Sequence, residues 1–259
     1  MHPSLRNQPQ SAEPATLLHM TTFALVHGAW SGAWCWERLA PELEARGHRV
    51  VAPDLPCDDP AATMTTYADV VLRALEGEPD DLVLVGHSLA GCTIPLVAAR
   101  RPVGRLVYLC AIVPIPGRSH GEQLRAEPDT LVPGALDGLG PPDALDRTSW
   151  ADEEATRRAL FADCPDDVAR DAFARLRPQA RAPYREPCPL DAFPPAPATY
   201  VRCAEDRVID GDWSRRVASG RLEAGLVDLP GDHSPMLSRP AALAGVLSGP
   251  TSAASRSPR

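Results

Sequence analysis

The fold is decided by one stretch of the sequence, residues 81–91, which reads DLVLVGHSLAG. An apolar run typical of a buried strand leads into Gly86, Ser88 and Ala90, and a helical pattern follows. A serine at the tip of such a turn has a strained backbone, and its neighbours two positions away must be small because strand and helix nearly collide. The stretch therefore predicts a nucleophile elbow, although Ala90 departs from the commoner glycine. A tight connection without catalytic role is the alternative interpretation.

Outward from this stretch, short apolar runs alternate with helical patterns. Strands are expected at residues 23–26, 49–52, 82–85, 106–110, 199–202 and 226–229, and helices at 34–46, 66–76 and 88–100. Continuous apolar strands separated by helices are typical of a parallel sheet covered on both faces. The sequence thus predicts the α/β class, with a mostly parallel sheet flanked by helices.

The alternation breaks after Pro114. Residues 117–187 contain no convincing buried strand but show helical character at 151–161 and 166–176, which predicts an inserted helical lid. The expected organisation is a disordered tail at 1–19, a core in two parts at 20–116 and 188–247, the lid at 117–187, a closing helix at 240–247 and a disordered tail at 248–259.

A serine hydroxyl is a weak nucleophile, so the elbow requires a base and an acid that orients the base. In this fold both follow the serine and lie just after strands, the acid first. His233 follows the strand at 226–229 and is the one late histidine; the other histidines are at 2, 19, 27, 48, 87 and 120. Glu205, Asp206 and Asp210 all follow the strand at 199–202, with Asp206 preferred and Asp210 as the second choice.

The negative oxygen formed during acyl transfer needs two backbone donors. One is expected from the N–H of Leu89, directly after the serine. The other is expected from Ala29, in a loop where Gly28 permits close approach of the backbone. Trp30 in the same loop is a candidate for substrate contact, whereas Trp34 and Trp36 are expected in the core.

The composition argues against several classes of partner and ligand. The net charge of -8 and the scattered arginines argue against nucleic acid as a partner, and no lysine occurs. Seven cysteines without zinc-like spacing, no secretory signal and no long apolar run predict a cytoplasmic protein that binds no metal, cofactor or membrane, as a monomer or homodimer.

The motifs HGAWSGAWCW (27–36), GHSLAG (86–91), AEDRVI (204–209) and GDHSPMLSRP (231–240) together resemble the α/β-hydrolase family that contains plant methylesterases, hydroxynitrile lyases and bacterial esterases. The resemblance covers residues 22–247 and implies Ser88 as nucleophile, His233 as base and Asp206 as orienting acid. The lyase branch typically carries a threonine and a lysine at the positions of Gly28 and Ser234, so cyanohydrin cleavage is disfavoured. An elbow serine likewise disfavours epoxide hydrolases and haloalkane dehalogenases, which need an aspartate there.

The expected activity is hydrolysis of a small carboxylic ester or lactone through an acyl-enzyme on Ser88. Three alternatives stay open: a thioesterase, a biosynthetic enzyme that uses the fold for non-hydrolytic chemistry, and a non-catalytic relative that binds a small molecule.

Overall fold

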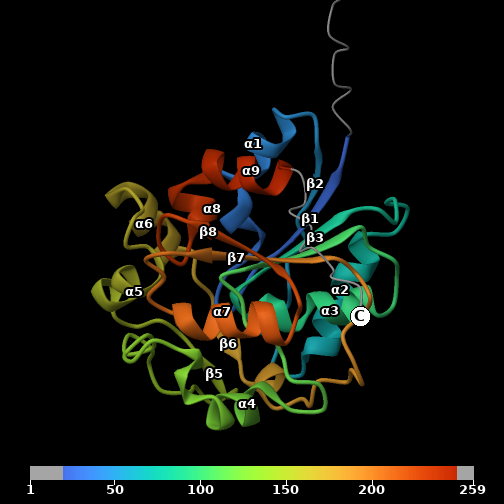
Figure 1. Cartoon of the computed structure of the whole chain (residues 1–259). Coiled ribbons are helices and arrows are strands. Elements are labelled where there is room, and N and C mark those ends of the chain that lie inside the picture. Colours follow the sequence, from blue (N-terminus) through green and yellow to red (C-terminus); the bar gives the residue numbers. More distant parts are fainter. Residues whose placement is uncertain (1–19, 250–259) are drawn as a thin grey trace, which may run out of the picture.

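A single six-stranded parallel sheet forms the centre of the computed structural model, which describes residues 20–249 (Figure 1). The strand order is β2-β1-β3-β4-β7-β8. The strands are β1 (Thr22–Val26), β2 (Arg49–Val51), β3 (Val83–His87), β4 (Arg105–Leu109), β7 (Ala198–Cys203) and β8 (Gly225–Leu229). All six predicted strands are confirmed, with ends that differ by one or two residues. Every residue of β1, β3 and β4 is buried because helices cover both faces.

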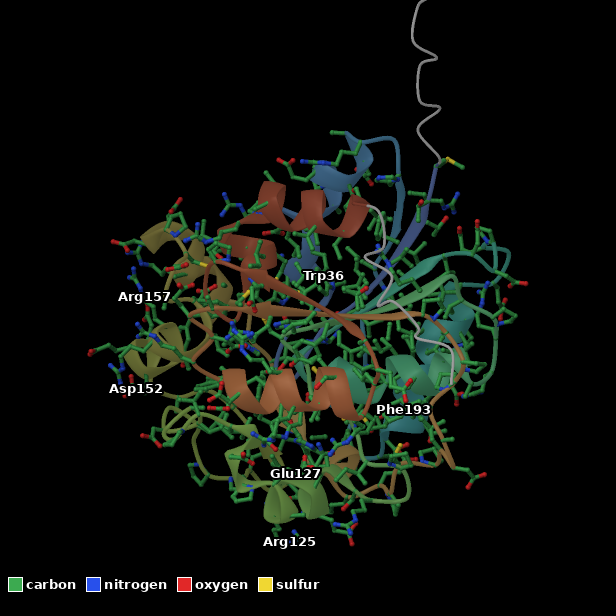
Figure 2. The ribbon with its side chains drawn as sticks, viewed as in Figure 1. Trp36, Arg125, Glu127, Asp152, Arg157 and Phe193 are labelled. Atoms are coloured by element: carbon green, nitrogen blue, oxygen red, sulfur yellow. The ribbon has the colours of Figure 1, made fainter. Side chains whose placement is uncertain are left out.

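Helices pack on the two faces of this sheet (Figure 1). One face carries α1 (Ala40–Glu44) and α9 (Pro240–Ser248), which contact each other. The other carries α2 (Met64–Ala74), α3 (Ile94–Ala98) and α7 (Gly211–Gly220). Trp36 is almost fully buried and is among the largest side chains of the core (Figure 2). The elbow at the end of β3 is thus held between two packed layers.

Two predicted helices are shorter than expected. The segment 34–46 divides into η1 (Ala33–Trp36) and α1, and 88–100 divides into η2 (Ser88–Cys92) and α3. Pro41 and Pro95 lie in the first turns of α1 and α3. Proline is tolerated there because the first N–H groups of a helix have no partner, but it does not continue a helix from the preceding turn.

The segment between β4 and β7 combines helices with a small sheet. It contains α4 (His120–Ala126), η3 (Pro128–Thr130), β5 (Arg147–Thr148), α5 (Glu153–Leu160), α6 (Asp166–Ala174), β6 (Gln179–Ala180) and η4 (Ala182–Tyr184). The expectation of no buried strand here was wrong, because β6 is buried and pairs antiparallel with β5. Two residues are too few for periodicity to reveal a strand.

Charged side chains fix the outer surface of this inserted segment. Asp152 caps the start of α5 by accepting a hydrogen bond from the N–H of Ala155 at 2.9 Å, and Arg157 pairs with Asp166 of α6 (Figure 2). α5 and α6 lie side by side beyond one end of the sheet (Figure 1). The segment therefore stands over that end as the expected lid; the boundaries 117 and 187 stay a prediction.

The sequence interpretation omitted α4 and α7, although both carry start signals. Ser119 and Glu122 form a capping box at α4, and Asp210 caps α7. The helix α9 includes Ser248, which was expected in the C-terminal tail; residues 250–259 of that tail and the tail at 1–19 lie outside the described residues. Among residues 20–249, no helix has the length and apolar character needed to cross a membrane.

Candidate active site

Ser88 lies at the sharp turn between β3 and η2 and has a positive φ of 52°. This left-handed conformation is rare for a residue with a side chain and marks backbone strain. A Cβ on Gly86 would lie 2.9 Å from the Ala90 carbonyl oxygen, and one on Gly91 would lie 2.0 Å from that of Ile112. The small residues around the serine are therefore required by contact between strand, turn and neighbouring backbone.

His233 and Asp206 are in direct contact at the ends of β8 and β7. The imidazole Nδ1 lies 3.0 and 3.1 Å from the two carboxylate oxygens of Asp206, and both side chains are almost fully buried. The same carboxylate accepts hydrogen bonds from the N–H groups of Val208 and Ile209. An ionised carboxylate only accepts, so Nδ1 carries the proton and Nε2 is left with a free lone pair.

The other two acids near β7 have different partners. Asp210 accepts hydrogen bonds from the N–H groups of Asp212 and Trp213 and so caps α7. Glu205 accepts one from the N–H of Gly231. Of the three candidates, only Asp206 contacts His233 in the described part of the chain.

His87, directly before the serine, supports the backbone of His233. Its Nε2 lies 2.8 Å from the His233 carbonyl oxygen, and the two rings are 4.7 Å apart. Because a carbonyl only accepts, Nε2 of His87 carries the proton. Burial, and next the neighbouring His233, hold the pKa of His87 well below its ordinary value, so the ring is neutral.

The loop after β1 approaches the serine closely. A Cβ on Gly28 would lie 2.9 Å from the Ser88 Cβ, and within residues 20–249 the N–H of Ala29 has no hydrogen-bond partner. His27 fixes the loop: its Nε2 accepts from the N–H of Leu55 at 2.9 Å, so its Nδ1 donates to the Gly28 carbonyl at 2.8 Å. Burial lowers the pKa of His27 to about 4 and keeps it in this neutral form. The loop therefore lies close to Ser88 with the Ala29 N–H unpartnered, and its role as an oxyanion donor stays a prediction.

The lid segment holds the far end of this loop. Gln179 is fully buried and accepts from the Trp30 N–H at 3.3 Å, while the Trp30 carbonyl accepts from the Arg177 N–H at 2.8 Å. The Arg177 guanidinium donates to the carbonyl of Ser31. Trp30 has a positive φ of 59°, and these contacts offset that strain.

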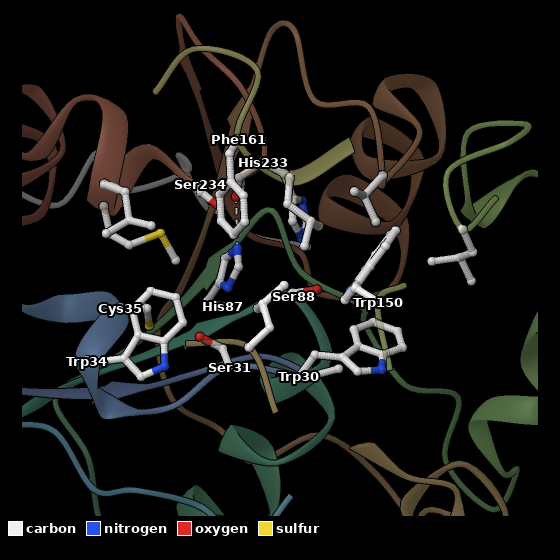
Figure 3. Close-up of a pocket in the computed structure, with 17 residues that line it drawn as sticks. Trp30, Ser31, Trp34, Cys35, His87, Ser88, Trp150, Phe161, His233 and Ser234 are labelled. Atoms are coloured by element: carbon white, nitrogen blue, oxygen red, sulfur yellow. Dashed lines mark hydrogen bonds between the residues drawn. The ribbon is translucent and has the colours of Figure 1, made fainter. Parts of the chain in front are cut away.

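A small cavity of about 30 Å³ lies at the site (Figure 3). Ser88 and His233 both line it, and the lid contributes Trp150 and Phe161 to the lining. Its described lining contains no acidic or arginine side chain. The lining residues are Ala29, Trp30, Ser31, Trp34, Cys35, His87, Ser88, Leu136, Trp150, Leu160, Phe161, Leu176, Val208, His233, Ser234, Met236 and Leu237. Such a lining suits an uncharged, apolar molecule.

Sequence comparison agrees with this geometry. Residues 23–246 match the model of the alpha/beta hydrolase family. The chain belongs to that family. This alpha/beta hydrolase is 32% identical over 243 residues to a pyrethroid hydrolase from Sphingobium wenxiniae, with 87% of this chain and 85% of the relative covered. It is 28% identical over 246 residues to methylesterase 3 of Arabidopsis thaliana, with 86% and 93% covered.

The fold also matches solved structures. The crystal structure of a pyrethroid hydrolase from Sphingobium faniae JZ-2 superposes with a TM-score of 0.78 at 28% identity, covering 88% of this alpha/beta hydrolase and 96% of that chain. The arrangement of sheet, helices and inserted segment is therefore shared with an ester-cleaving relative.

Among the described residues, one group of possible metal ligands overlaps the site. Cys110, Asp206 and His233 each place one ligand atom within 4.8 Å of the others. Burial holds the pKa of the Cys110 thiol well above its ordinary value, which disfavours the thiolate that a metal binds. In this alpha/beta hydrolase the carboxylate and imidazole already satisfy each other, so the cluster fits a hydrogen-bonded pair better than a metal centre.

Several residues that shape the site were not predicted. His87 follows a recognisable strand, but no spacing rule indicates that its ring reaches the carbonyl of His233. Gln179 and Trp150 lie in the inserted segment of this alpha/beta hydrolase, outside its two helical patterns at 151–161 and 166–176. Only the tertiary arrangement brings them to the oxyanion loop and the cavity.

Proposed function

We propose that the chain is a serine esterase that hydrolyses small, uncharged, apolar carboxylic esters through an acyl-enzyme on Ser88. The observation that carries this proposal is the buried contact between His233 Nδ1 and the Asp206 carboxylate at 3.0 Å, beside a strained serine in one cavity. That arrangement supports a base with a free Nε2 lone pair next to a serine hydroxyl.

In the proposed acylation, His233 Nε2 takes the proton of the Ser88 hydroxyl while Oγ forms a bond to the ester carbonyl carbon. The carbonyl oxygen becomes negative, and the N–H groups of Ala29 and Leu89 donate to it. When the intermediate collapses, the bond to the alcohol oxygen breaks, and His233 gives its proton to that oxygen. The alcohol leaves and the acyl group remains on Ser88.

Deacylation repeats these steps with water. His233 Nε2 takes a proton from water, whose oxygen attacks the acyl carbon, and the bond to Ser88 Oγ breaks as the proton returns to it. Asp206 keeps the imidazole in one tautomer throughout and stabilises its positive form.

The substrate class rests on the cavity and on the relatives. The cavity has no charged group for a carboxylate or ammonium, so desolvating an ionic substrate would cost free energy without compensation. The relatives named pyrethroid hydrolase and methylesterase support ester cleavage. The same lining, rich in indole and aliphatic side chains, supports apolar ester groups.

Labelling with a fluorophosphonate probe tests the proposal. The wild-type protein should become labelled, and Ser88→Ala should lose both the label and about 10⁶-fold in kcat if the triad acts as a unit. Ser219→Ala is the matched control, since Ser219 is exposed on α7 and bonds only to its own helix. A well-folded wild-type protein without label would contradict catalysis and favour small-molecule binding. A panel of p-nitrophenyl esters, lactones and thioesters then separates esterase from thioesterase.

A further inference from the structure

Three side chains that line the cavity each carry a buried polar atom without a hydrogen-bond partner among residues 20–249: Trp34 Nε1, His87 Nδ1 and Trp150 Nε1. Trp150 is the one of the three that the inserted segment contributes. The indole Nε1 of Trp150 is buried and makes no hydrogen bond among residues 20–249, although the side chain lines the same cavity as Ser88. Trp150 as a residue is 7% exposed, and its ring extends from the lid toward Ser88 (Figure 3). A buried N–H group that lacks an acceptor destabilises the folded protein, so it requires an explanation.

The ring is held in place from several sides. Trp150 packs edge-on against Trp30 with ring centroids 5.6 Å apart. A Cβ on Gly138 would lie 3.0 Å from two of its ring carbons, and its backbone forms a bridge with Leu139. The N–H group therefore has a fixed direction and little freedom to find another acceptor within the protein.

The neighbouring Trp30 shows the contrast. Trp30 also lines the cavity, but its indole Nε1 donates to the Thr148 carbonyl at 3.1 Å. Two indoles are in contact, and within residues 20–249 the inserted segment supplies an acceptor for the N–H of Trp30 but none for the N–H of Trp150.

We propose that the Trp150 indole N–H selects uncharged esters that carry a second acceptor oxygen, such as an ether, away from the scissile carbonyl. An indole N–H donates only and carries no charge, so it matches a neutral oxygen acceptor. A site built to hydrogen-bond its substrate discriminates strongly against an analogue that lacks the atom, because the buried donor is then left unpaired. This inference rests on the proposed esterase function and names the atom of the substrate, a second acceptor oxygen, that Trp150 recognises.

Matched pairs of esters test the selection. One pair is p-nitrophenyl 3-phenoxypropanoate and p-nitrophenyl 4-phenylbutanoate, and the other is 2-phenoxyethyl acetate and 3-phenylpropyl acetate. Each pair exchanges an ether oxygen for a methylene, on the acyl side or on the alcohol side. The wild-type protein should favour the ether ester in at least one pair by about tenfold or more in kcat/KM. Trp150→Phe should bring that ratio close to one.

Trp36→Phe is the matched control. The Trp36 Nε1 is also buried without a partner, but Trp36 does not line the cavity, so its loss should leave the ether preference unchanged. An equal rate for ether and methylene esters in both pairs, or an ether preference that survives in Trp150→Phe, would overturn the proposal. Absence of ester cleavage and of fluorophosphonate labelling would instead overturn the esterase function.

A second measurement uses the wild-type protein alone, in case Trp150→Phe does not fold. The alcohols 2-phenoxyethanol and 3-phenylpropanol should inhibit ester hydrolysis, and so should 3-phenoxypropanamide and 4-phenylbutanamide, the uncharged amides of the first pair. The ether compound should inhibit more strongly in the pair that shows the kinetic preference. Equal inhibition constants within both pairs would contradict the role of the indole donor.

Discussion

Gly28→Ala changes one hydrogen into a methyl group at the narrowest point of the site. The added Cβ would lie 2.9 Å from the Ser88 Cβ, about 0.5 Å inside ordinary contact at 3.4 Å, and 3.1 Å from the His87 carbonyl oxygen. Neither neighbour can rotate away, because one is the first atom of the nucleophile side chain and the other is backbone. The loop that carries Ala29 must therefore shift away from the serine.

The size of the effect follows from that displacement. A shift of about 1 Å in a reacting group can cost about 100-fold in rate, and complete loss of an oxyanion donor costs about 3 kcal/mol. A shift of about half that size should lower kcat by about tenfold to 100-fold, with a smaller change in KM. Fluorophosphonate labelling of Ser88 should slow by a similar factor, because the phosphoryl oxygen uses the same donors.

The matched control is Gly245→Ala, which adds the same methyl group to helix α9. No atom lies within 4 Å of that Cβ, so the variant should keep wild-type kcat and gain up to about 1 kcal/mol in unfolding free energy. Both variants are compared by steady-state kinetics and urea unfolding. Wild-type kcat and labelling rate in a folded Gly28→Ala protein would refute the assignment of this loop as an oxyanion donor.

Three further predictions concern the acid that orients His233, the hydrogen bond of His87, and two buried histidines. Asp206→Ala should lower kcat by about 10⁴-fold, whereas Asp210→Ala should keep kcat and lose about 1 kcal/mol of unfolding free energy through its helix cap; the reverse result would exchange their roles. His87→Gln, whose amide can donate to the His233 carbonyl, should retain most of kcat, while His87→Leu should lose about tenfold or more; equal losses would contradict this hydrogen bond. Burial lowers the pKa of His27 and of His120 to about 4 in the folded protein, against an ordinary value of 6.5 in the unfolded chain. As the pH falls below 6.5, the unfolded chain therefore binds these two protons before the folded protein does, and the folded protein loses stability. Urea unfolding at pH 7 and pH 5 should show a loss of about 2 kcal/mol for each histidine, and constant stability would contradict their neutral burial.

The centre of the sheet was predictable because β1, β3 and β4 are buried on both faces. Continuous apolar runs such as 82–85 and 106–110 indicate buried strands. The small residues at positions 86 and 90 indicate that the backbones of strand and following turn lie very close together. The ends of the helices were harder to place. Pro41 and Pro95 each start a new helix in a pattern that periodicity alone reads as continuous.

The candidate triad could be predicted by order along the chain, but the choice of acid required coordinates. Asp206 and Asp210 are four residues apart after the same strand, and only the geometry shows that one meets His233 and the other caps a helix. The contributions of Trp150 and Gln179 depend on contacts across more than a hundred residues of sequence. No local pattern encodes such distant pairs.

The hydrogen bonds that Arg177 donates and Gln179 accepts make the lid part of the support of the loop after β1. Engineers who alter selectivity by transplanting lids between hydrolases would, in this protein, also remove the partners of Trp30 and Ser31. A transplanted lid would bring a new specificity together with a misaligned loop. Residues 27–31 and 177–180 therefore form one cassette, and a working chimaera must exchange both parts from the same donor.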